Sequence, residues 1–461
     1  MTPVKPKPRI KQNNNNMKKS LITAGLLALG LISTASANTI VTLTGSTAYR
    51  AVVYQACTTP GVVFASAASG APADVAVVST PANPNNNGAN DIVYEGYIKN
   101  TDGTYTLYDL VCSFTGSEAG IAAAAQSAGI NNPTPAFNGG TSPLPGVPPK
   151  YLTQASGWQT KGDGTTTVPH TTDLAMADTS QAVSLTKSVA GTATELAIPG
   201  GGTGIVGIVP FVYMKGHNSA PTTSSWGHLV NITHAAVRVA IQSGAQVPRL
   251  FTGNAGDPDT DQVIVVGRNI GSGTHVNQML DLGIPVATPV DQFAINSTYS
   301  AAGVLTQNGV IAYTDANVLE VGADGFDSGG SVANCLKCDG KGSAFIPIGM
   351  LGLSDAFGLP IHTGGAEAGG AVALPLDGVT ESNGAVENAQ YGDWGHEHIY
   401  GKHGQLSTDP GGIVGAHVRT GITSTLTTLG WGTVAATQDI GIPTSLMHCD
   451  KPGDGGDPAP L

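Results

Sequence analysis

The stretch DQVIVVGRNIGSGTHVNQMLDLG (residues 261–283) begins with an apolar, β-branched run, passes through a turn of small residues and ends in a helical pattern. Two other stretches have the same order, TIVTLTGSTAYRAVVYQA (39–56) and TLYDLVCSFTGSEAGIAAAAQSA (106–128). Repeated strand–turn–helix units predict a parallel sheet with helices on its faces, and such sheets bind ligands beyond the carboxyl ends of their strands. The sequence therefore predicts an α/β protein with its site at these turns.

The three turns, at residues 45–47, 116–117 and 271–274, suit an oxyanion. The first N–H groups of a helix have no partner within the helix and carry the positive end of its dipole, so small residues let an anion come close. Serine and threonine are also ordinary helix N-caps, and one such turn alone indicates little. Three turns at strand-to-helix junctions favour an anion site.

Two charged residues sharpen this interpretation. Arg268 lies four residues before Ser272, and its planar guanidinium can donate to two oxygens of a tetrahedral anion. The alternative for Arg268 is a surface ion pair. Asp178 ends the apolar run in DLAMADTSQA (173–182). A carboxylate there can accept a hydrogen bond from the O–H of hydrogen phosphate, whereas sulfate at neutral pH has no O–H to donate; the alternative is a helix cap.

In this order, the segments TGSTAYR, TGSEAGI, LAMADTS and VVGRNIGSGT resemble those of the periplasmic phosphate-binding proteins of ABC transporters, within the type II periplasmic binding protein superfamily. LVNITHAAVRVAIQSG and FIPIGMLGLSDA are similar to further segments of that family. The resemblance implies capture of inorganic phosphate, with Ala48 contributing its backbone N–H. The phosphate-binding residues that it implies are Ser46, Thr47, Ala48, Ser117, Asp178, Arg268, Ser272, Gly273 and Thr274.

The resemblance also implies two α/β domains, each a mainly parallel sheet flanked by helices. Two crossover strands, expected in GIVGIVPFVYMKG (204–216) and QYGDWGHEHIY (390–400), would let the domains close on the ligand like a hinge. The first domain would comprise residues 38–212 and 389–461, and the second residues 213–388. The implied partner is an ABC permease, and no cofactor and no metal are expected.

One departure from the family pattern concerns the second turn. Glu118 and Ala119 stand where the family usually has serine and glycine. An acid beside an anion is unfavourable, so we expect Glu118 to point away from the ligand or to pair with Arg268.

The N-terminus has the parts of a secretory signal from Met17 to Ala37, after an upstream extension: two lysines, an apolar stretch too short for a bilayer, and small residues before Asn38. We expect a periplasmic or secreted chain with no membrane insertion after cleavage. Removing residues 1–37 deletes six Lys and Arg and no acid, which takes the formal charge from −12 to −18. Such an acidic chain repels nucleic acid in general, and we expect a monomer.

Five cysteines in an exported chain predict disulfides with one thiol left over. Cys57 and Cys112 each lie near a Gly-Ser turn and are candidates to pair. The motif CLKC (335–338) is expected to form a disulfide loop, and the alternative is zinc held together with residues 448–449.

Three regions have a simpler interpretation. Residues 131–169, rich in Pro, Gly and Thr, are interpreted as a long surface insertion, and the tail DKPGDGGDPAP (450–460) as disordered. DPDTD (257–261) alternates like part of a calcium loop but lacks its later glycine and bidentate glutamate, so a solvated turn is favoured.

Two other functional classes remain open. A secreted phosphatase-like member of the superfamily would need a nucleophile with a base or a metal cluster. The candidate is WGHEHIYGKHG (394–404), in which His396 and His398 share one face of a strand, Glu397 lies opposite and His403 follows. Surface histidines on a crossover strand are the alternative. The third class is a non-catalytic surface or structural protein, which the Gly, Ala and Thr content would suit.

Overall fold

The computed structural model describes most of the chain after residue 38. The expected extension and signal segment (residues 1–37) and the expected insertion at 131–169 lie outside the described residues. None of the helices in the described ranges combines the length and apolar character of a membrane span. The described ranges are 39–80, 91–114, 116–125, 172–184, 196–218, 221, 223–295, 318–322, 324–326, 328–357, 371–429, 441–451, 453–455 and 457–461.

In this part of the chain, one ten-stranded sheet runs through the molecule in the order β2-β3-β4-β1-β5-β12-β6-β10-β7, with β11 also paired to β6. Two small sheets pair β8 with β9 and β13 with β14. The strands are β1 (Thr39–Gly45), β2 (Ala76–Thr80), β3 (Asp91–Lys99), β4 (Tyr105–Ser113), β5 (Leu174–Ala177), β6 (Ile205–Lys215), β7 (Gln262–Val265), β8 (Phe293–Ile295), β9 (Val318–Glu320), β10 (Phe345–Gly352), β11 (Val372–Leu374), β12 (Trp394–Gly401), β13 (Cys449–Asp450) and β14 (Ala459–Pro460).

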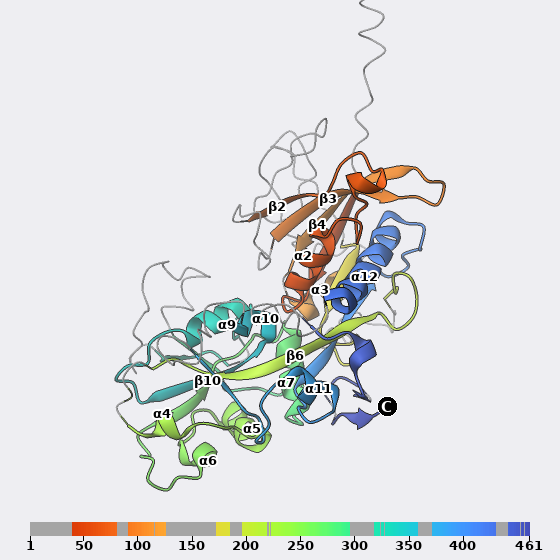
Figure 1. The fold of residues 1–461 in the computed structure, drawn as a ribbon. Coiled ribbons are helices and arrows are strands. Elements are labelled where there is room, and N and C mark those ends of the chain that lie inside the picture. Colours follow the sequence, from red (N-terminus) through yellow and green to blue (C-terminus); the bar gives the residue numbers. More distant parts are fainter. Residues whose placement is uncertain are drawn as a thin grey trace, which may run out of the picture.

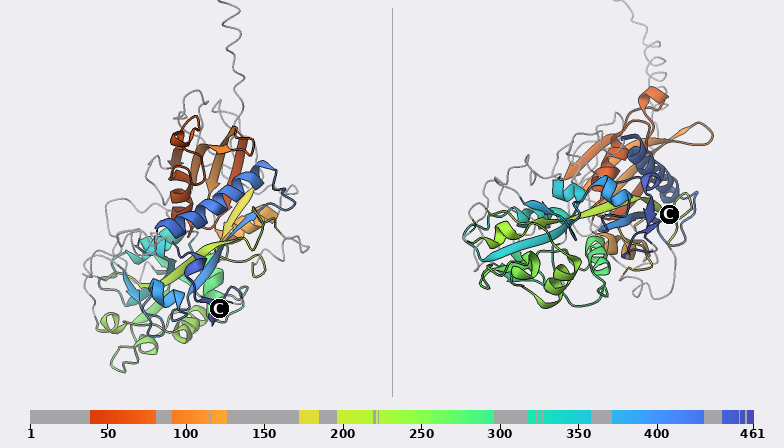
Figure 2. Two further views of the ribbon diagram at one scale, coloured as in Figure 1. Left: turned by 45° about the vertical axis from the view of Figure 1, so that its right-hand side comes forward. Right: turned by 60° about the horizontal axis from the view of Figure 1, so that its bottom comes forward.

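Helices cover both ends of this sheet, and the α/β class is confirmed. In Figure 1, α2, α3 and α12 lie with the strands at one end, and α4, α5, α6, α9 and α10 lie at the other; Figure 2 shows the same two groups from other sides. The helices are α2 (Arg50–Thr58), α3 (Ser117–Ala125), α4 (Ser225–His228), α5 (His234–Ser243), α6 (Arg249–Thr252), α7 (Gly273–Asp281), α9 (Gly329–Leu336), α10 (Leu353–Phe357), α11 (Asn383–Glu387) and α12 (Pro410–Leu429), with 3₁₀ turns at Ala67–Ser69 and Thr444–Leu446.

The three predicted strand–turn–helix units are present as β1–α2, β4–α3 and β7–α7. Strands β4, β1 and β5 pair in parallel, as do β10 and β7, whereas β2 and β3 add an antiparallel edge. Strand β1 is buried from Val41 onward, and α2 turns Val52, Val53 and Ala56 toward the same core. The parallel strands therefore bring their carboxyl ends, and the turns that follow, to one edge.

The two expected crossover strands are β6 and β12, which lie side by side and antiparallel in the middle of the sheet. Residues 205–210 of β6 pair with β12, and residues 211–215 pair with β10. Figure 1 shows β6 as a long strand that runs from the group with α9 and α10 towards the group with α12. The backbone thus passes from one half to the other through two adjacent strands.

The prediction of disulfides is wrong, because all five cysteines are described and none of them forms a disulfide. Cys57 and Cys112 are buried in the main core, where burial raises the pKa of the Cys57 thiol well above its usual value. The cysteines of CLKC (335–338) lie at the end of α9 in a second core cluster, whereas Cys449 belongs to the first. Each thiol packs as a small apolar group, and the zinc alternative has no support.

The C-terminal tail is ordered in its described residues, so its interpretation as disordered was wrong. β13 and β14 pair, and Lys451 and Asp454 are buried. Lys451 Nζ lies 2.8 Å from Asp281 Oδ1 in α7, and the Asp454 carboxylate accepts a hydrogen bond from the backbone N–H of Ser180. Composition suggested a solvated tail, but two of its charges have partners in the folded chain.

His234, at the start of α5, bridges two carboxylates from distant segments. Its Nε2 lies 2.9 Å from Asp393 Oδ1, and its Nδ1 contacts Asp377. Hydrogen bonds to Asp393 lead the causes that raise the pKa of His234 to about 9. The protonated ring is therefore favoured in the folded state, and its stabilisation is complete below the unfolded pKa near 6.5 and lost as pH rises through about 9.

We expect the free energy of unfolding to fall by about 1–2 kcal/mol across this window, since the ring is partly exposed and screened by solvent. His234→Gln should remove most of this fall, as measured by urea unfolding at pH 6 and pH 9.5. The exposed His448, changed to Gln, is the control and should keep the wild-type fall. An equal fall in His234→Gln would contradict the role of the bridge.

Candidate oxyanion site

The ends of two parallel strands and the beginnings of two helices meet at one point. β1 ends at Gly45 and β5 at Ala177, whereas α3 begins at Ser117 and α7 at Gly273. Three backbone hydrogen bonds join these ends, one of them between the two halves of the molecule. They run from Ser46 N to Met176 O (2.7 Å), from Gly116 N to Gly45 O (2.8 Å) and, between the halves, from Glu118 N to Gly271 O (3.2 Å).

Asp178 lies at this point, directly after β5, and is 1% exposed. Ser117 Oγ donates to one carboxylate oxygen, and Thr274 Oγ1 donates to the other at 3.3 Å. Burial raises the pKa of Asp178, although the Ser117 hydrogen bond and the charge of Arg268 act in the opposite direction. A Cβ at Gly273 would lie 1.7 Å from Asp178 Oδ1, so the approach of α7 to this carboxylate requires glycine.

The N-terminus of α7 supplies donors beside Asp178. Ser272 is the N-cap residue, and its buried hydroxyl has no hydrogen-bond partner among the described residues. The first N–H groups of a helix lack partners within the helix and carry partial positive charge. Asn277 fixes the helix against the strand end, because its Nδ2 donates to Asp178 O at 2.6 Å and to Gly273 O at 3.2 Å.

Arg268 is 3% exposed and follows β7 by three residues. Its Nε donates to Phe326 O at 3.2 Å, and Gln292 Nε2 donates to the Arg268 carbonyl at 3.2 Å, so both ends of the residue are held. The guanidinium charge favours the ionised form of Asp178. It also disfavours the protonated form of His275, whose pKa is lowered to about 4 mainly by burial. Arg268 is therefore a buried cation whose charge reaches Asp178, and the surface ion pair considered from the sequence is wrong.

The first turn joins the site through a residue that was not predicted. Ser46 Oγ donates to Glu397 Oε2 at 3.2 Å. Thr47 and Ala48 are buried in the turn before α2, and the Ala48 carbonyl accepts a hydrogen bond from Ser354 Oγ at 3.0 Å. The structure therefore groups most of the predicted residues around Asp178 and places the first turn next to it. The residues grouped around Asp178 are Ser117, Arg268, Ser272, Gly273 and Thr274.

Glu118, the acid at the second turn, is held by hydroxyl groups of the segment that follows Asp178. Although buried, its carboxylate accepts hydrogen bonds from Ser184 Oγ at 2.6 Å and from Thr179 Oγ1 at 3.4 Å. These donors lie on the segment after Asp178. The extra acid therefore has its own partners beside the site.

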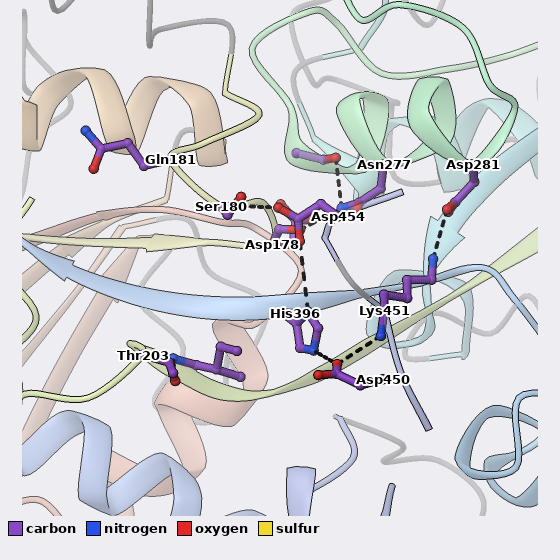
Figure 3. Close-up of polar contacts among 12 residues, drawn as sticks. Asp178, Ser180, Gln181, Thr203, Asn277, Asp281, His396, Asp450, Lys451 and Asp454 are labelled. Atoms are coloured by element: carbon purple, nitrogen blue, oxygen red, sulfur yellow. Dashed lines mark hydrogen bonds and ion pairs between the residues drawn. The ribbon is translucent and has the colours of Figure 1, made fainter. Parts of the chain in front are cut away.

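The ordered tail lies next to His396 of β12 and next to the loop that carries Asp178 and Ser180 (Figure 3). His396 Nε2 lies 3.0 Å from Asp450 Oδ1, and His396 Nδ1 lies 4.0 Å from Asp454 Oδ1. Asp454 holds the backbone of Ser180, two residues after Asp178. The tail thus supports the loop that carries Asp178, and Lys451 links it to α7.

The histidines of β12 are buried, so the interpretation as surface histidines was wrong. His396 pairs with the tail, and His398 stacks on Tyr400, with its pKa lowered to about 4 by burial. Within the described ranges, no three His, Cys, Asp or Glu side chains form a group that could hold a metal. In DPDTD (257–261), Asp257 is buried and contacts His228 at 2.6 Å, so that turn is only partly solvated.

Glu397 and Asn277 are the site residues that sequence reasoning missed. The alternation of a strand did separate Glu397 from His396 and His398, but it did not indicate which face points toward Asp178. Asn277 lies four residues after Gly273, one helical turn along the same face of α7. A polar amide at this position of the helix was the sequence feature that could have indicated a role for Asn277 at the site.

No protein-family model matches the chain, and no curated protein matches it. Several solved structures do, at low identity. A protein from Clostridium perfringens, described as a phosphate ABC transporter substrate-binding protein with bound phosphate, is 13% identical, with a TM-score of 0.40, over 84% of this chain and 97% of that one. PstS from Borrelia burgdorferi is 11% identical, with a TM-score of 0.31, over 86% and 98% of the two chains.

An ABC-type phosphate transport receptor from Vibrio cholerae is 11% identical, with a TM-score of 0.29, over 56% of this chain and 79% of that one. All three TM-scores are below 0.5. These likenesses by themselves assign neither a family nor a ligand to this chain.

Proposed function

We propose that this protein is a periplasmic or secreted binding protein that captures inorganic phosphate by hinge closure. The observation that carries the proposal is the buried Asp178 carboxylate, which lies between the N-termini of α3 and α7 and within reach of the Arg268 charge. Hydroxyl donors, helix N-termini and an arginine suit a tetrahedral oxyanion. A carboxylate among them suits an anion that still carries a proton.

In this proposal, phosphate replaces the carboxylate as the acceptor for two hydroxyls. Ser117 and Thr274 donate to Asp178 without ligand and turn to donate to phosphate oxygens when it binds. The ligand's own O–H then donates to Asp178. Sulfate has no O–H to donate, so its bound form would place an acceptor oxygen against the Asp178 carboxylate. The resulting repulsion makes the site bind sulfate much more weakly than phosphate.

Ligand entry requires the two halves to separate at the contact between α3 and the turn before α7. We assign residues 38–212 and 389–461 to one domain and 213–388 to the other, with β6 and β12 as the hinge. The change of β6 partner from β12 to β10 at Phe211 supports this boundary. The closed form presents a surface for an ABC permease.

Asp178→Asn tests whether the Asp178 carboxylate accepts a hydrogen bond from the phosphate O–H. We expect the preference for phosphate over sulfate to narrow at least tenfold, about 1.4 kcal/mol, because the amide can donate to a sulfate oxygen. Burial raises the Asp178 pKa, so the carboxyl group takes up a proton at acidic pH and can then donate to a sulfate oxygen. The preference of the wild type for phosphate over sulfate should therefore also weaken at acidic pH. The measurement is calorimetric titration of both anions into the mature chain, stripped of bound anion by unfolding and refolding.

Asp173→Asn is the matched control, because Asp173 lies five residues earlier and pairs with Lys402 at 2.9 Å. It should keep the wild-type selectivity. Unchanged binding and selectivity in Asp178→Asn would remove the carboxylate from the ligand. Stoichiometric capture of phosphate is expected, whereas repeated release of phosphate from an added ester would favour the phosphatase class, and no phosphate affinity would favour the structural class.

A further inference from the structure

Glu397 is a buried acid that the proposed site has not yet used. It lies on β12, is 0% exposed and contacts Ser46, whereas the neighbouring His396 pairs with Asp450 in the tail. Its Oε2 accepts a hydrogen bond from Ser46 Oγ at 3.2 Å. Its Oε1 has no hydrogen-bond partner among the described residues. One oxygen of this fully buried carboxyl group therefore lacks a hydrogen-bond partner among the described residues.

The groups that face Glu397 do not neutralise it. Asp178 at the end of β5 acts on it as a like charge, and Ser46 at the end of β1 donates one hydrogen bond. Tyr49 lies in the turn before α2 and Tyr400 on the same strand as Glu397. Burial and the charge of Glu397 raise the pKa of both phenols, so they stay neutral and do not compensate that charge. Arg50, in the first turn of α2, is already paired with Asp355 at 2.9 Å.

The acids of neighbouring elements add to this imbalance. Glu118 in α3 and Asp454 in the tail act, like Glu397, on the Tyr400 phenol. Burial raises the pKa of Glu397 well above its ordinary value, and Asp178 raises it further. An ionised, unpaired carboxylate in such surroundings is costly. Glu397 therefore needs a proton, either its own or one shared with a bound group.

We propose that Glu397 is a second ligand-facing carboxyl, so that phosphate binds together with one additional proton held between a phosphate oxygen and Glu397. This inference rests on the proposed function. Hydrogen phosphate has one O–H group, which donates a hydrogen bond to the Asp178 carboxylate. A second carboxyl is satisfied only when dihydrogen phosphate binds, or when hydrogen phosphate binds and Glu397 takes a proton from solvent. Both routes give a complex with the same number of protons.

The test is proton uptake measured by calorimetry at a series of pH values from about 8 to about 10, where free phosphate is mostly the doubly charged form. Titration of phosphate in two buffers of different ionisation enthalpy gives the number of protons bound with each anion. We expect uptake to approach about one proton per phosphate, and phosphate affinity to fall about tenfold per pH unit, once the pH is high enough for Glu397 to be ionised in the free protein. Phosphate binding by the wild type without proton uptake at every pH of this series would overturn the inference and leave the proposed function intact.

Glu397→Gln assigns the proton to this residue. The amide has nearly the same shape and needs no proton, so uptake should fall close to zero and the pH dependence should flatten. Glu320→Gln, at an exposed residue of β9, is the control and should retain uptake. Full uptake in a folded Glu397→Gln protein would overturn the assignment. The wild-type measurement decides the inference even if this variant fails to fold. No phosphate heat from the wild type at any pH would overturn the proposed function and this inference together.

Discussion

Arg268→Ala is expected to weaken phosphate binding by about 2–5 kcal/mol, the range for truncating one partner of a buried charge pair. This is roughly a thirtyfold to several-thousandfold increase in Kd. Arg268 is 3% exposed and its charge favours the ionised form of Asp178. Its removal leaves a carboxylate and an anion together without that compensating charge. Calorimetric titration with phosphate at pH 7 measures the loss.

Two variants separate the charge from the geometry. Arg268→Lys keeps the charge but loses the planar donor pair, so an intermediate loss of affinity is expected. Arg249→Ala removes an exposed arginine that pairs with Asp259 at 2.7 Å and should leave the Kd unchanged. Because Arg268 Nε also donates to Phe326 O, urea unfolding should confirm that each variant is folded. A wild-type Kd in Arg268→Ala would exclude this residue from the site.

The sequence predicted the parts of this molecule that depend on local pattern. Apolar β-branched runs before Gly45 and before Arg268, each followed by small residues and a helical pattern, specify a strand, a turn and a helix within about 20 residues. Parallel pairing then brings such turns to one edge of the sheet. Ser117, Asp178 and Thr274 could therefore be predicted as neighbours without knowledge of their individual contacts.

The features that were missed depend on contacts between distant parts of the chain. The folded position of β12 brings Glu397 close enough to Asp178 for their charges to interact, whereas His396 pairs with Asp450 in the tail. The tail is ordered because Lys451 and Asp454 find partners 170 and 274 residues away. Cysteine spacing likewise carries no information on whether two thiols meet in disulfide geometry, which requires a specific Cα separation.

Gly45→Ala is expected to destabilise the protein by about 3 kcal/mol or more, a large part of the 5–15 kcal/mol typical of a folded protein. Gly45 has φ +114°, which L-residues rarely adopt, and such strain costs about 1–3 kcal/mol. A Cβ there would also lie 1.9 Å from Met176 O, where β1 and β5 pair. Relieving that overlap adds about 1–3 kcal/mol, as for other overpacked sites.

Gly61→Ala isolates the second contribution, because Gly61 also has positive φ, +79°, but a Cβ there would meet nothing within 4 Å. We expect it to lose only the cost of backbone strain, so the difference between the two variants in urea unfolding measures the close approach of β1 to β5. If the two losses are equal, the strand ends are further apart than the hydrogen bond from Ser46 N to Met176 O requires. A larger loss of stability in Gly45→Ala would show that the contact between Gly45 and Met176 holds Ser46 beside Asp178 and Glu397. Phosphate affinity should then fall together with stability in Gly45→Ala and stay unchanged in Gly61→Ala.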